Sequence, residues 1–241
     1  MPKKVNVKGY IIPNSYKFFF DYFGMDSTCP NDVEKALNEA KGGAIEVYIN
    51  SPGGIIDVGS EIYTMLRAYK GDVKMYIVGE ACSAASVIAM ARYCEMSPTA
   101  LMMVHCVSTG IYGNHTVFEH TAEVLRTADE ALCTAYVAKS GMTKEEALAM
   151  MEYETWMNAE KAKEKGLIDA IMFEQAEPLR LTASTFSLPS AEQLEKVKNL
   201  IKEQAEPAGD DGTTDDGKSV FLIQAAKAKL NLLKLKGGIR E

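Results

Sequence analysis

The strongest constraint on the fold of this chain is a repeated order of short apolar runs, glycine-containing turns and helical patterns. Ile45–Ile49 is rich in β-branched residues and enters Asn50–Gly54, a cluster of turn formers that precedes a helical pattern. Val73–Val78 repeats the arrangement ahead of Ser83–Arg92, which is apolar nearly all round and is typical of a buried helix. Alternation of this kind predicts an α/β domain with mostly parallel strands.

The other predicted elements extend the same alternation along the chain. Further strands are predicted at Val5–Ile12, Leu101–Val104 and Leu167–Met172. Helices are predicted at Asp32–Lys41, Val58–Tyr69, Thr116–Lys139, after a capping box at Thr143–Glu146, and at Ala159–Lys165 behind an Asn158 cap.

The composition changes near Phe173, so residues 1–173 are predicted to be one domain and residues 174–241 a C-terminal extension. The extension contains a charged helix over Ser190–Gln204. An acidic linker at 206–217 has no large apolar residue, which is typical of a flexible segment. A basic amphipathic helix over 219–236 follows, and its mixed Leu/Lys face favours partner binding over membrane insertion.

Charge and cysteine content exclude several classes of function. The net charge of −7 argues against binding to nucleic acid or to an anionic membrane. No apolar stretch is long enough to span a bilayer, and no apolar run follows the basic start, so we expect a cytoplasmic protein. The five cysteines lack the spacing of a zinc or redox motif, which predicts reduced thiols and no metal site. No cofactor is expected.

The two glycine-containing turns are candidate sites of acyl chemistry, because each precedes a helix whose first N–H groups have no intrahelical partner. Gly54 in the first turn and Ala84 in the second are candidates for the two N–H groups of an oxyanion hole. Ser83, directly before Ala84, is the candidate nucleophile at the N-terminus of a buried helix, whose dipole favours developing negative charge.

A serine nucleophile needs a base, and His105 is the best placed of the three histidines, since it directly follows the predicted strand Leu101–Val104. His115 and His120 lie in or near a polar helix, where a solvated role is expected. Glu154 is the candidate acid that orients the imidazole. Each has a plainer interpretation that stays open: a small packing residue, a core histidine and a surface carboxylate.

Five segments, in order and in register, resemble the Clp protease proteolytic subunit over about residues 5–172. These segments are Tyr48–Gly54, the nucleophile motif Gly79–Ser83, the strand end Met102–His105, Glu154–Ala162 and Gly166–Asp169. The resemblance implies a crotonase-like α/β spiral in which Thr116–Lys139 is a protruding handle helix. It also implies a polypeptide substrate and a heptameric ring, with a second ring joined face to face through the handles.

The same resemblance assigns a role to each candidate residue. It implies a triad of Ser83, His105 and Glu154, with oxyanion N–H groups from Gly54 and Ala84. It implies substrate contacts along a strand after the histidine and beside the first turn, at Ile55, Cys106, Val107, Ser108 and Gly110.

Several positions depart from the family pattern. The acid is Glu154 where the family has Asp, and Ala85 stands where the family has Gly. Glu46 and Ala68 stand where the family places aromatic residues that dock its ATPase, and a carboxylate there argues against such a partner. These features resemble the phage and prophage branch, as do the nucleophile segment Ala81–Ser86 and Trp156 after the acid. That branch implies a head-maturation protease that acts on capsid or scaffold proteins.

Three alternatives remain open from the sequence. A crotonase-type enzyme acting on an acyl-coenzyme A would share the fold and the oxyanion hole without needing Ser83 and His105. A catalytically silent Clp-like scaffold is opposed by the complete Ser–His–acid set, and the change to Glu154 keeps it open. A serine peptidase with a lysine base would draw on Lys70 or Lys74, which lie at the start of the strand leading to Ser83.

Overall fold

The computed structural model describes residues 2–174 and 195–199. The first range folds around a sheet whose strands are β1 (Lys3–Ile11), β2 (Ser27–Thr28), β3 (Ile45–Gly54), β4 (Val73–Cys82), β5 (Tyr93–Met96), β6 (Leu101–Val104), β7 (Thr155–Met157) and β8 (Ala170–Ile171). Their order is β2-β1-β3-β4-β5-β8, and β6 pairs with both β4 and β7. Among these described strands the pairs are parallel, except the antiparallel pair β6–β7.

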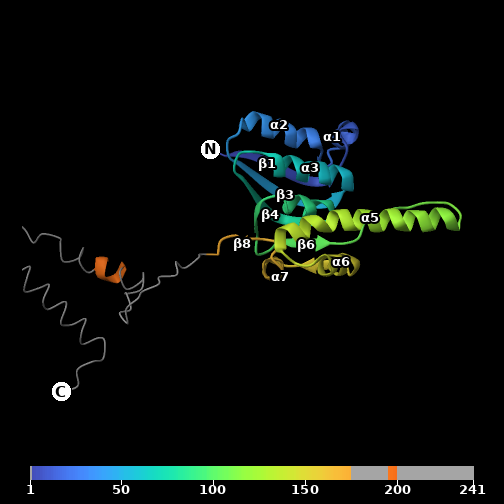
Figure 1. Cartoon of the computed structure of the whole chain (residues 1–241). Helices are drawn as coiled ribbons and strands as arrows, with labels where there is room; N and C mark the ends of the chain where they lie inside the picture. The colour runs from blue at the N-terminus through green and yellow to red at the C-terminus, as the bar shows by residue number, and fades with distance from the viewer. Residues whose placement is uncertain (1, 175–194, 200–241) are drawn as a thin grey trace, which may run out of the picture. The chain divides into compact units, whose positions relative to one another are not determined.

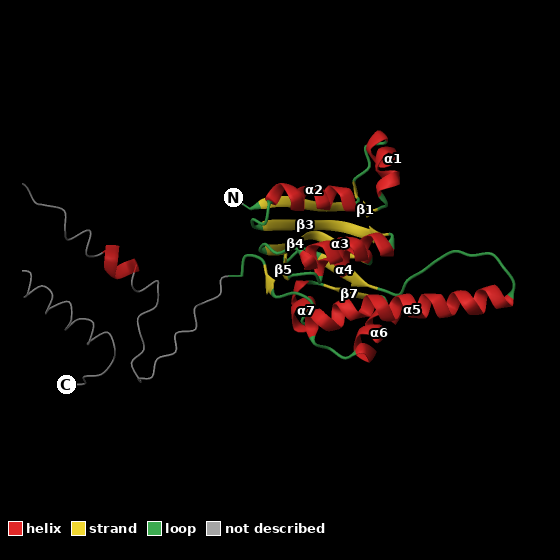
Figure 2. Ribbon diagram, turned by 45° about the horizontal axis from the view of Figure 1, so that its top comes forward, coloured by secondary structure: helices red, strands yellow, loops and turns green. Residues whose placement is uncertain are grey.

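Helices cover this sheet and extend from one end of it (Figures 1 and 2). They are the short 3₁₀ turn η1 (Asn14–Tyr16) and the α-helices α1 (Lys17–Tyr22), α2 (Pro30–Ala40), α3 (Ile56–Ala68), α4 (Ala84–Ala89), α5 (His115–Ser140), α6 (Lys144–Glu152) and α7 (Ala159–Glu164). α2 packs on β1, and α4 packs on β3, β4 and α3. The mixed α/β fold confirms the predicted α/β domain with mostly parallel strands.

The register of three strands brings their carboxyl ends to one edge of the sheet. β3 and β4 are paired from Ile45↔Val73 to Ser51↔Ala81, and β6 joins β4 at its far end, with Cys82 opposite Met103. The turns that follow β3, β4 and β6 therefore lie together, which is where ligand sites gather in open parallel sheets.

The core lies between the sheet and its helices. Ile49, Ile77, Met102 and Ile88 are fully buried, and every residue of α4 is buried. Burial of one such side chain contributes roughly 1.5–3 kcal/mol. The predicted all-round burial of this helix is confirmed, so the residue that begins it is held on a rigid element.

Some element boundaries differ from the sequence prediction. β4 continues past Val78 to Cys82, because its last residues pair with β6. The predicted strand Leu167–Met172 is reduced to β8, because the N–H of Leu167 still bonds the carbonyl of Ala162 at the end of α7. The short elements α1, β2, β5 and β7 were not predicted.

α5 matches the predicted long helix and projects beyond the sheet (Figures 1 and 2). Its 26 residues give it a length of about 39 Å. Asn114 caps it by accepting a hydrogen bond from the N–H of Val117 at 3.2 Å. Its buried side chains begin only at Asp129, so its first half makes few contacts with the core.

Most of the predicted extension lies outside the described residues. Residues 195–199 are helical, within the predicted helix Ser190–Gln204. The linker at 206–217 and the helix at 219–236 lie outside the described residues, and the boundary at residue 173 stays a prediction. Across residues 2–174 and 195–199, no helix has the length and apolarity needed to cross a membrane.

Candidate active site

Ser83 occupies the sharp junction between β4 and α4. Its backbone has φ 55° and ψ −126°, a conformation that residues other than glycine rarely adopt. Strained backbone of this kind is concentrated at functional sites. Its N–H donates to the carbonyl of Met103 at 3.0 Å, and its carbonyl accepts from the hydroxyl of Ser86 at 2.6 Å. The neighbouring strand and the first turn of the helix thus hold this conformation in place.

His105 reaches Ser83 because their strands are adjacent and parallel. Cys82 pairs with Met103, so the residue after β4 and the residue just past β6 meet at the same edge. The Nε2 atom of His105 lies 2.8 Å from the Oγ of Ser83. The structure therefore brings the two candidates within hydrogen-bonding distance across 22 residues of sequence.

The first glycine turn packs directly against Ser83. Gly53 has a φ of 99°, and a Cβ added there would lie 2.6 Å from the carbonyl oxygen of Cys82 and 2.7 Å from the Cβ of Ser83. The same Cβ would lie 3.2 Å from the nitrogen of Ala84, the first residue of α4. The two turns are therefore in contact, as an oxyanion hole built from both would require.

A buried serine fixes the shape of that first turn. The hydroxyl of Ser51 donates to the carbonyl of Gly9 at 2.6 Å and accepts from the N–H of Gly53 at 3.1 Å. Gly54 has a φ of 155°, and a Cβ there would lie 2.2 Å from the carbonyl oxygen of Ile11. The backbone at both glycines is thus packed too closely for any side chain. Gly53 is buried and Gly54 is exposed.

Glu154 lies beside the histidine in backbone position, but its carboxylate has another partner. Val104 pairs with Thr155, so continuing this antiparallel register places Glu154 opposite His105. The carboxylate of Glu154 is exposed and accepts a hydrogen bond from the indole N–H of Trp156 at 3.2 Å. Among the described residues, the histidine has no hydrogen bond to this acid.

The candidate substrate-contacting residues fall on two segments. Ile55 follows the first turn as the cap of α3 and is 47% exposed. Cys106 and Val107 are half-buried and Ser108 is exposed, in a segment that leads to α5 and forms no strand. The N–H of Val107 already donates to the carboxylate of Asp129 at 2.6 Å, so this N–H is not available to pair with a substrate strand.

Sequence reasoning missed two buried groups on α5 that contact this region. Asp129 binds the segment after His105, and the hydroxyl of Tyr136 lies 2.7 Å from that of Ser86. Burial raises the pKa of Tyr136, so its hydroxyl stays protonated and available as a donor. Their spacing in the sequence could have indicated that they act together, because Asp129 and Tyr136 are two helical turns apart and share a face of α5.

The two cysteines next to Ser83 and His105 are poor nucleophiles, which favours the serine hydroxyl in that role. Burial, then the Glu80 carboxylate, raises the pKa of the Cys82 thiol to about 12, and burial, then Asp129, raises that of Cys106 to about 11. Both are protonated near neutral pH and so are poor nucleophiles. Within the described ranges no group of three or more His, Cys, Asp or Glu side chains is placed to hold a metal ion.

Comparison with known protein families matches residues 35–175 of this chain to the Clp protease family. The matched range is more than half of the chain, and it contains both glycine turns, the Ser83–His105 pair and Glu154. Proteases of this family act on polypeptides and typically form oligomers. The chain belongs to the Clp protease family.

Proposed function

We propose that this protein is a serine endopeptidase in which Ser83 attacks the peptide bond and His105 is the general base. The observation that carries the proposal is the 2.8 Å contact between the Oγ of Ser83 and the Nε2 of His105. This separation lies within the range needed for direct proton transfer. The strained backbone at Ser83 is a second support, because strain of this kind is concentrated at functional sites.

In the proposed mechanism, Nε2 of His105 accepts the hydroxyl proton as the Oγ of Ser83 bonds to the scissile carbonyl carbon. The protonated imidazole then donates that proton to the leaving amine, and the acyl-enzyme forms. A water molecule, deprotonated by the same nitrogen, releases the acyl group in the second half. Neutral His105 must carry its remaining proton on Nδ1 for the first step to proceed.

The negative charge on the carbonyl oxygen is stabilised by main-chain N–H groups at the contact between the two turns. We assign these N–H groups to Gly54 and Ala84. The support is the close packing at Gly53, which leaves no space for a side chain between the turns. Preorganised donors at such a position contribute about 10²–10³-fold in rate each.

We assign Glu154 to the third position, as the group that orients His105. Its support is the register of β6 and β7, which sets its backbone opposite the histidine. In this assignment the carboxylate exchanges its bond to Trp156 for one to the Nδ1–H of His105. The Glu side chain has three torsion angles, and this exchange requires their rotation.

We further propose a ring assembly, with seven subunits per ring and the first half of α5 joining two rings. The support is the exposure of three apolar side chains in this half, Val117, Phe118 and Val124, on a helix that projects from the sheet. A narrower proposal is that the natural substrates are capsid or scaffold proteins of a prophage. It rests on the nucleophile segment Ala81–Ser86, on Trp156 after the acid, and on Glu46 and Ala68 at the ATPase-docking positions.

One observation favours a second candidate, a catalytically silent scaffold of the same family. The bond between Glu154 and Trp156 leaves His105 without its orienting acid in this conformation. An acyl-coenzyme A enzyme of the same fold has no such support, because it does not require the Ser83–His105 contact.

The experiment is covalent labelling of the full chain with a fluorophosphonate, followed by mass spectrometry of the adduct. We expect a single adduct on Ser83 that is absent in Ser83→Ala and strongly reduced in His105→Ala. The control is Ser60→Ala, an exposed serine on α3 that has no assigned role in the site, which we expect to keep the label. A folded protein that takes up no label at Ser83 would favour the silent scaffold and refute the peptidase.

A further inference from the structure

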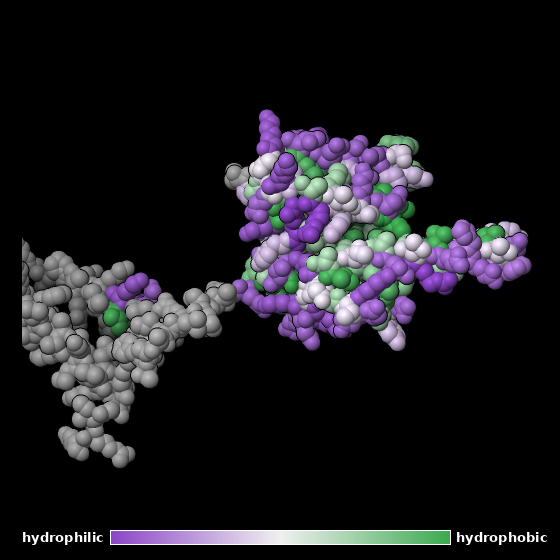
Figure 3. All heavy atoms as spheres, in the orientation of Figure 1, coloured by the Kyte–Doolittle hydropathy of each residue, from purple (hydrophilic) through white to green (hydrophobic). Residues whose placement is uncertain are grey.

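An aromatic segment lies between β1 and α2, close to the candidate active site. η1 and α1 form this segment, and no side chain of either is buried. Phe18 is 76% exposed, and Phe19 packs on Phe23 with ring centroids 4.8 Å apart. Exposed apolar side chains gathered in this way mark an interaction site more often than scattered ones do. Figure 3 shows the pale and green surface at the corner where Figure 1 places α1.

The segment encloses one side of a cavity of about 690 Å³. Its lining is almost entirely apolar and consists of Ile12, Pro13, Ser15, Tyr16, Phe18, Phe19, Phe20 and Ile55. The two charged residues of α1, Lys17 and Asp21, form an ion pair with each other at 2.5 Å and do not line the cavity. A site of this chemistry binds an uncharged apolar group, because a charged group would lose its hydration without gaining a partner.

The cavity lies next to the first glycine turn, because Ile11 at the end of β1 pairs with Gly54. Ile55 lines the cavity and directly follows Gly54. Its N–H donates to the carbonyl of Ile11 at 2.9 Å, which ties the first turn to the end of β1, where the cavity begins at Ile12. Consecutive Cα atoms lie about 3.8 Å apart, so the cavity wall begins one residue from the candidate oxyanion donor Gly54. An extended peptide advances by about 3.3 Å per residue, so one or two of its residues cover that span.

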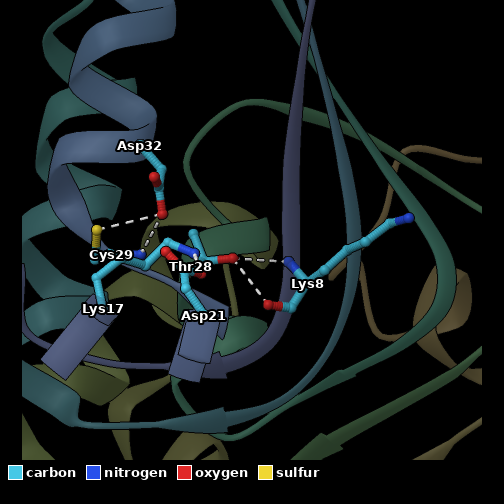
Figure 4. A network of polar contacts seen from close by, with 6 residues as sticks. All are labelled: Lys8, Lys17, Asp21, Thr28, Cys29 and Asp32. Carbon is cyan, nitrogen blue, oxygen red and sulfur yellow. Dashed lines mark hydrogen bonds and ion pairs between the residues drawn. The ribbon is translucent and has the colours of Figure 1, made fainter. Parts of the chain in front are cut away.

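The chain that follows α1 is anchored to β1 and to the start of α2. The hydroxyl of Thr28 accepts from the N–H of Lys8 at 2.8 Å and donates to its carbonyl at 2.9 Å (Figure 4). Next to it, Asp32 accepts from the N–H of Cys29 at 3.0 Å and from its thiol at 3.2 Å, which fixes the start of α2. These contacts fix the chain on the C-terminal side of α1, which reduces the ordering that binding at this segment requires.

We propose that this cavity is a substrate subsite that binds an uncharged aromatic or aliphatic side chain of the polypeptide, one or two residues from the scissile bond. The inference rests on the proposed peptidase function and adds a substrate preference to it. A second copy of the chain is the other possible occupant of an apolar cavity. The substrate is favoured because Ile55 belongs at once to the cavity and to the turn beside Ser83.

The test compares cleavage of matched fluorogenic peptides by the full chain and by two variants. The peptides carry Phe, Ala or Asp in turn at each of the two residues on either side of the cleaved bond. Phe18→Ala/Phe19→Ala opens the cavity, and Tyr22→Ala is the matched control, because Tyr22 is an 83% exposed aromatic residue of the same helix that does not line it.

We expect the double variant to lose ~10-fold or more in kcat/KM, through KM, on peptides with Phe at one position, and to change little with Ala there. Tyr22→Ala keeps the wild-type ratio of Phe to Ala peptides, and fluorophosphonate labelling of Ser83 proceeds at the wild-type rate in all three proteins. An unchanged ratio in the double variant, with labelling intact, overturns the subsite and leaves the peptidase standing.

Two other outcomes also decide the question. Equal loss on every peptide together with a smaller oligomer in sedimentation velocity makes this surface an interface between copies, and overturns the subsite. A wild-type protein that neither labels nor cleaves overturns the peptidase, and the subsite with it.

Discussion

Ser83 and Gly53 pack closely against each other, and only one of the two positions has space for a side chain. Ser83 keeps its side chain despite a φ of 55°, because Met103 and Ser86 bind its main chain from both sides. Gly53 has a φ of 99° and no space for a Cβ. The nucleophile is thus positioned by backbone packing on the turn opposite it.

Gly53→Ala is predicted to lower the rate of Ser83 labelling by ~10²-fold or more, because its Cβ would displace Cys82 and Ser83. Backbone strain adds about 1–3 kcal/mol of destabilisation, which thermal unfolding measures. Gly24→Ala is the control, since Gly24 also has a positive φ (65°) but nothing lies within 4 Å of an added Cβ. It should lose stability and keep its labelling rate. Equal labelling in both variants would contradict the contact.

Glu154→Gln is predicted to lower kcat on a cleaved peptide by ~10²-fold or more, with KM little changed, because an amide cannot stabilise the imidazolium that forms in the transition state. Trp156→Phe removes the competing indole donor and keeps an aromatic ring. We expect it to retain or raise kcat. If Glu154→Gln has wild-type kcat, Glu154 does not orient His105.

A buried thiol makes the free energy of unfolding fall at alkaline pH. The pKa of Cys82 is raised from 9.0 to about 12, so folding favours the protonated thiol. The resulting stabilisation is fully present below pH 9 and is lost as pH rises from about 9 to about 12, because the unfolded thiol ionises first. Urea unfolding at pH 8 and pH 10.5 should show a smaller loss of stability in Cys82→Ala than in wild type. Equal losses would contradict the buried, protonated thiol.

At the scale of elements, α5 is also part of the active-site scaffold. Its Asp129 binds the N–H of Val107, two residues after the histidine, and its Tyr136 contacts Ser86, which supports the carbonyl of Ser83. One helix therefore contacts the segments that carry both members of the candidate pair. Movement of this helix would be transmitted to the site through these two contacts.

Asp129→Ala is predicted to lower the free energy of unfolding by about 1–3 kcal/mol, because it leaves the half-buried N–H of Val107 without an acceptor. It should also slow labelling of Ser83, since the segment that carries His105 loses an anchor. Asp129→Asn keeps an acceptor oxygen and should recover most of both losses, as circular dichroism melts and labelling rates would show. If Asn and Ala behave alike, the hydrogen bond does not hold the segment.

The sequence predicted those elements whose periodicity is strong. β6 was placed to the residue, and the caps Thr143 and Asn158 were identified, because capping chemistry is local. The two- to four-residue strands β2, β5, β7 and β8 were missed or misplaced, because such segments are defined by their pairing partners rather than by their own pattern. α1 was missed because its aromatic residues bury no face and so give no amphipathic signal.

The sequence predicted the candidate site residues that belong to recognisable motifs, and it did not predict the others. Ser83, His105 and the glycine turns follow strands, so their convergence follows from parallel pairing. The partner of Glu154 was not predictable, because the choice between Trp156 and His105 is a matter of side-chain rotation. Asp129 lies 24 residues beyond His105, and only the packing of α5 brings it back to that segment.

At the scale of the whole molecule, the described part of the chain has two surfaces that a monomer leaves unpartnered, α1 and the first half of α5. Val117 and Val124 are two turns apart on α5, and each is exposed by about two-fifths or more. Apolar positions that repeat at this interval form a stripe suited to pairing with another helix. Assembly through this stripe is compatible with α1 remaining open to substrate.

Val124→Asp is predicted to reduce the size of the oligomer, because it places a charge within an apolar contact. Sedimentation velocity at several concentrations measures the change, with Thr116→Asp as the matched control at an exposed polar position of the same helix. The control should keep the wild-type size. An unchanged oligomer in Val124→Asp would mean that α5 does not join the rings.

The pairing of β4 with β6 has a consequence for how such a site tolerates change during evolution. The ladder from Glu80↔Leu101 to Cys82↔Met103 sets the distance between nucleophile and base, whatever the length of the chain that connects the two strands. Residues inserted at the exposed positions Pro98 and Thr99 of the connecting turn are therefore expected to leave the proton-transfer distance the same. A single slip of the ladder would separate the pair by a full residue step. We therefore expect this site to tolerate changes in that turn and not a slip in the alignment of the two short strands.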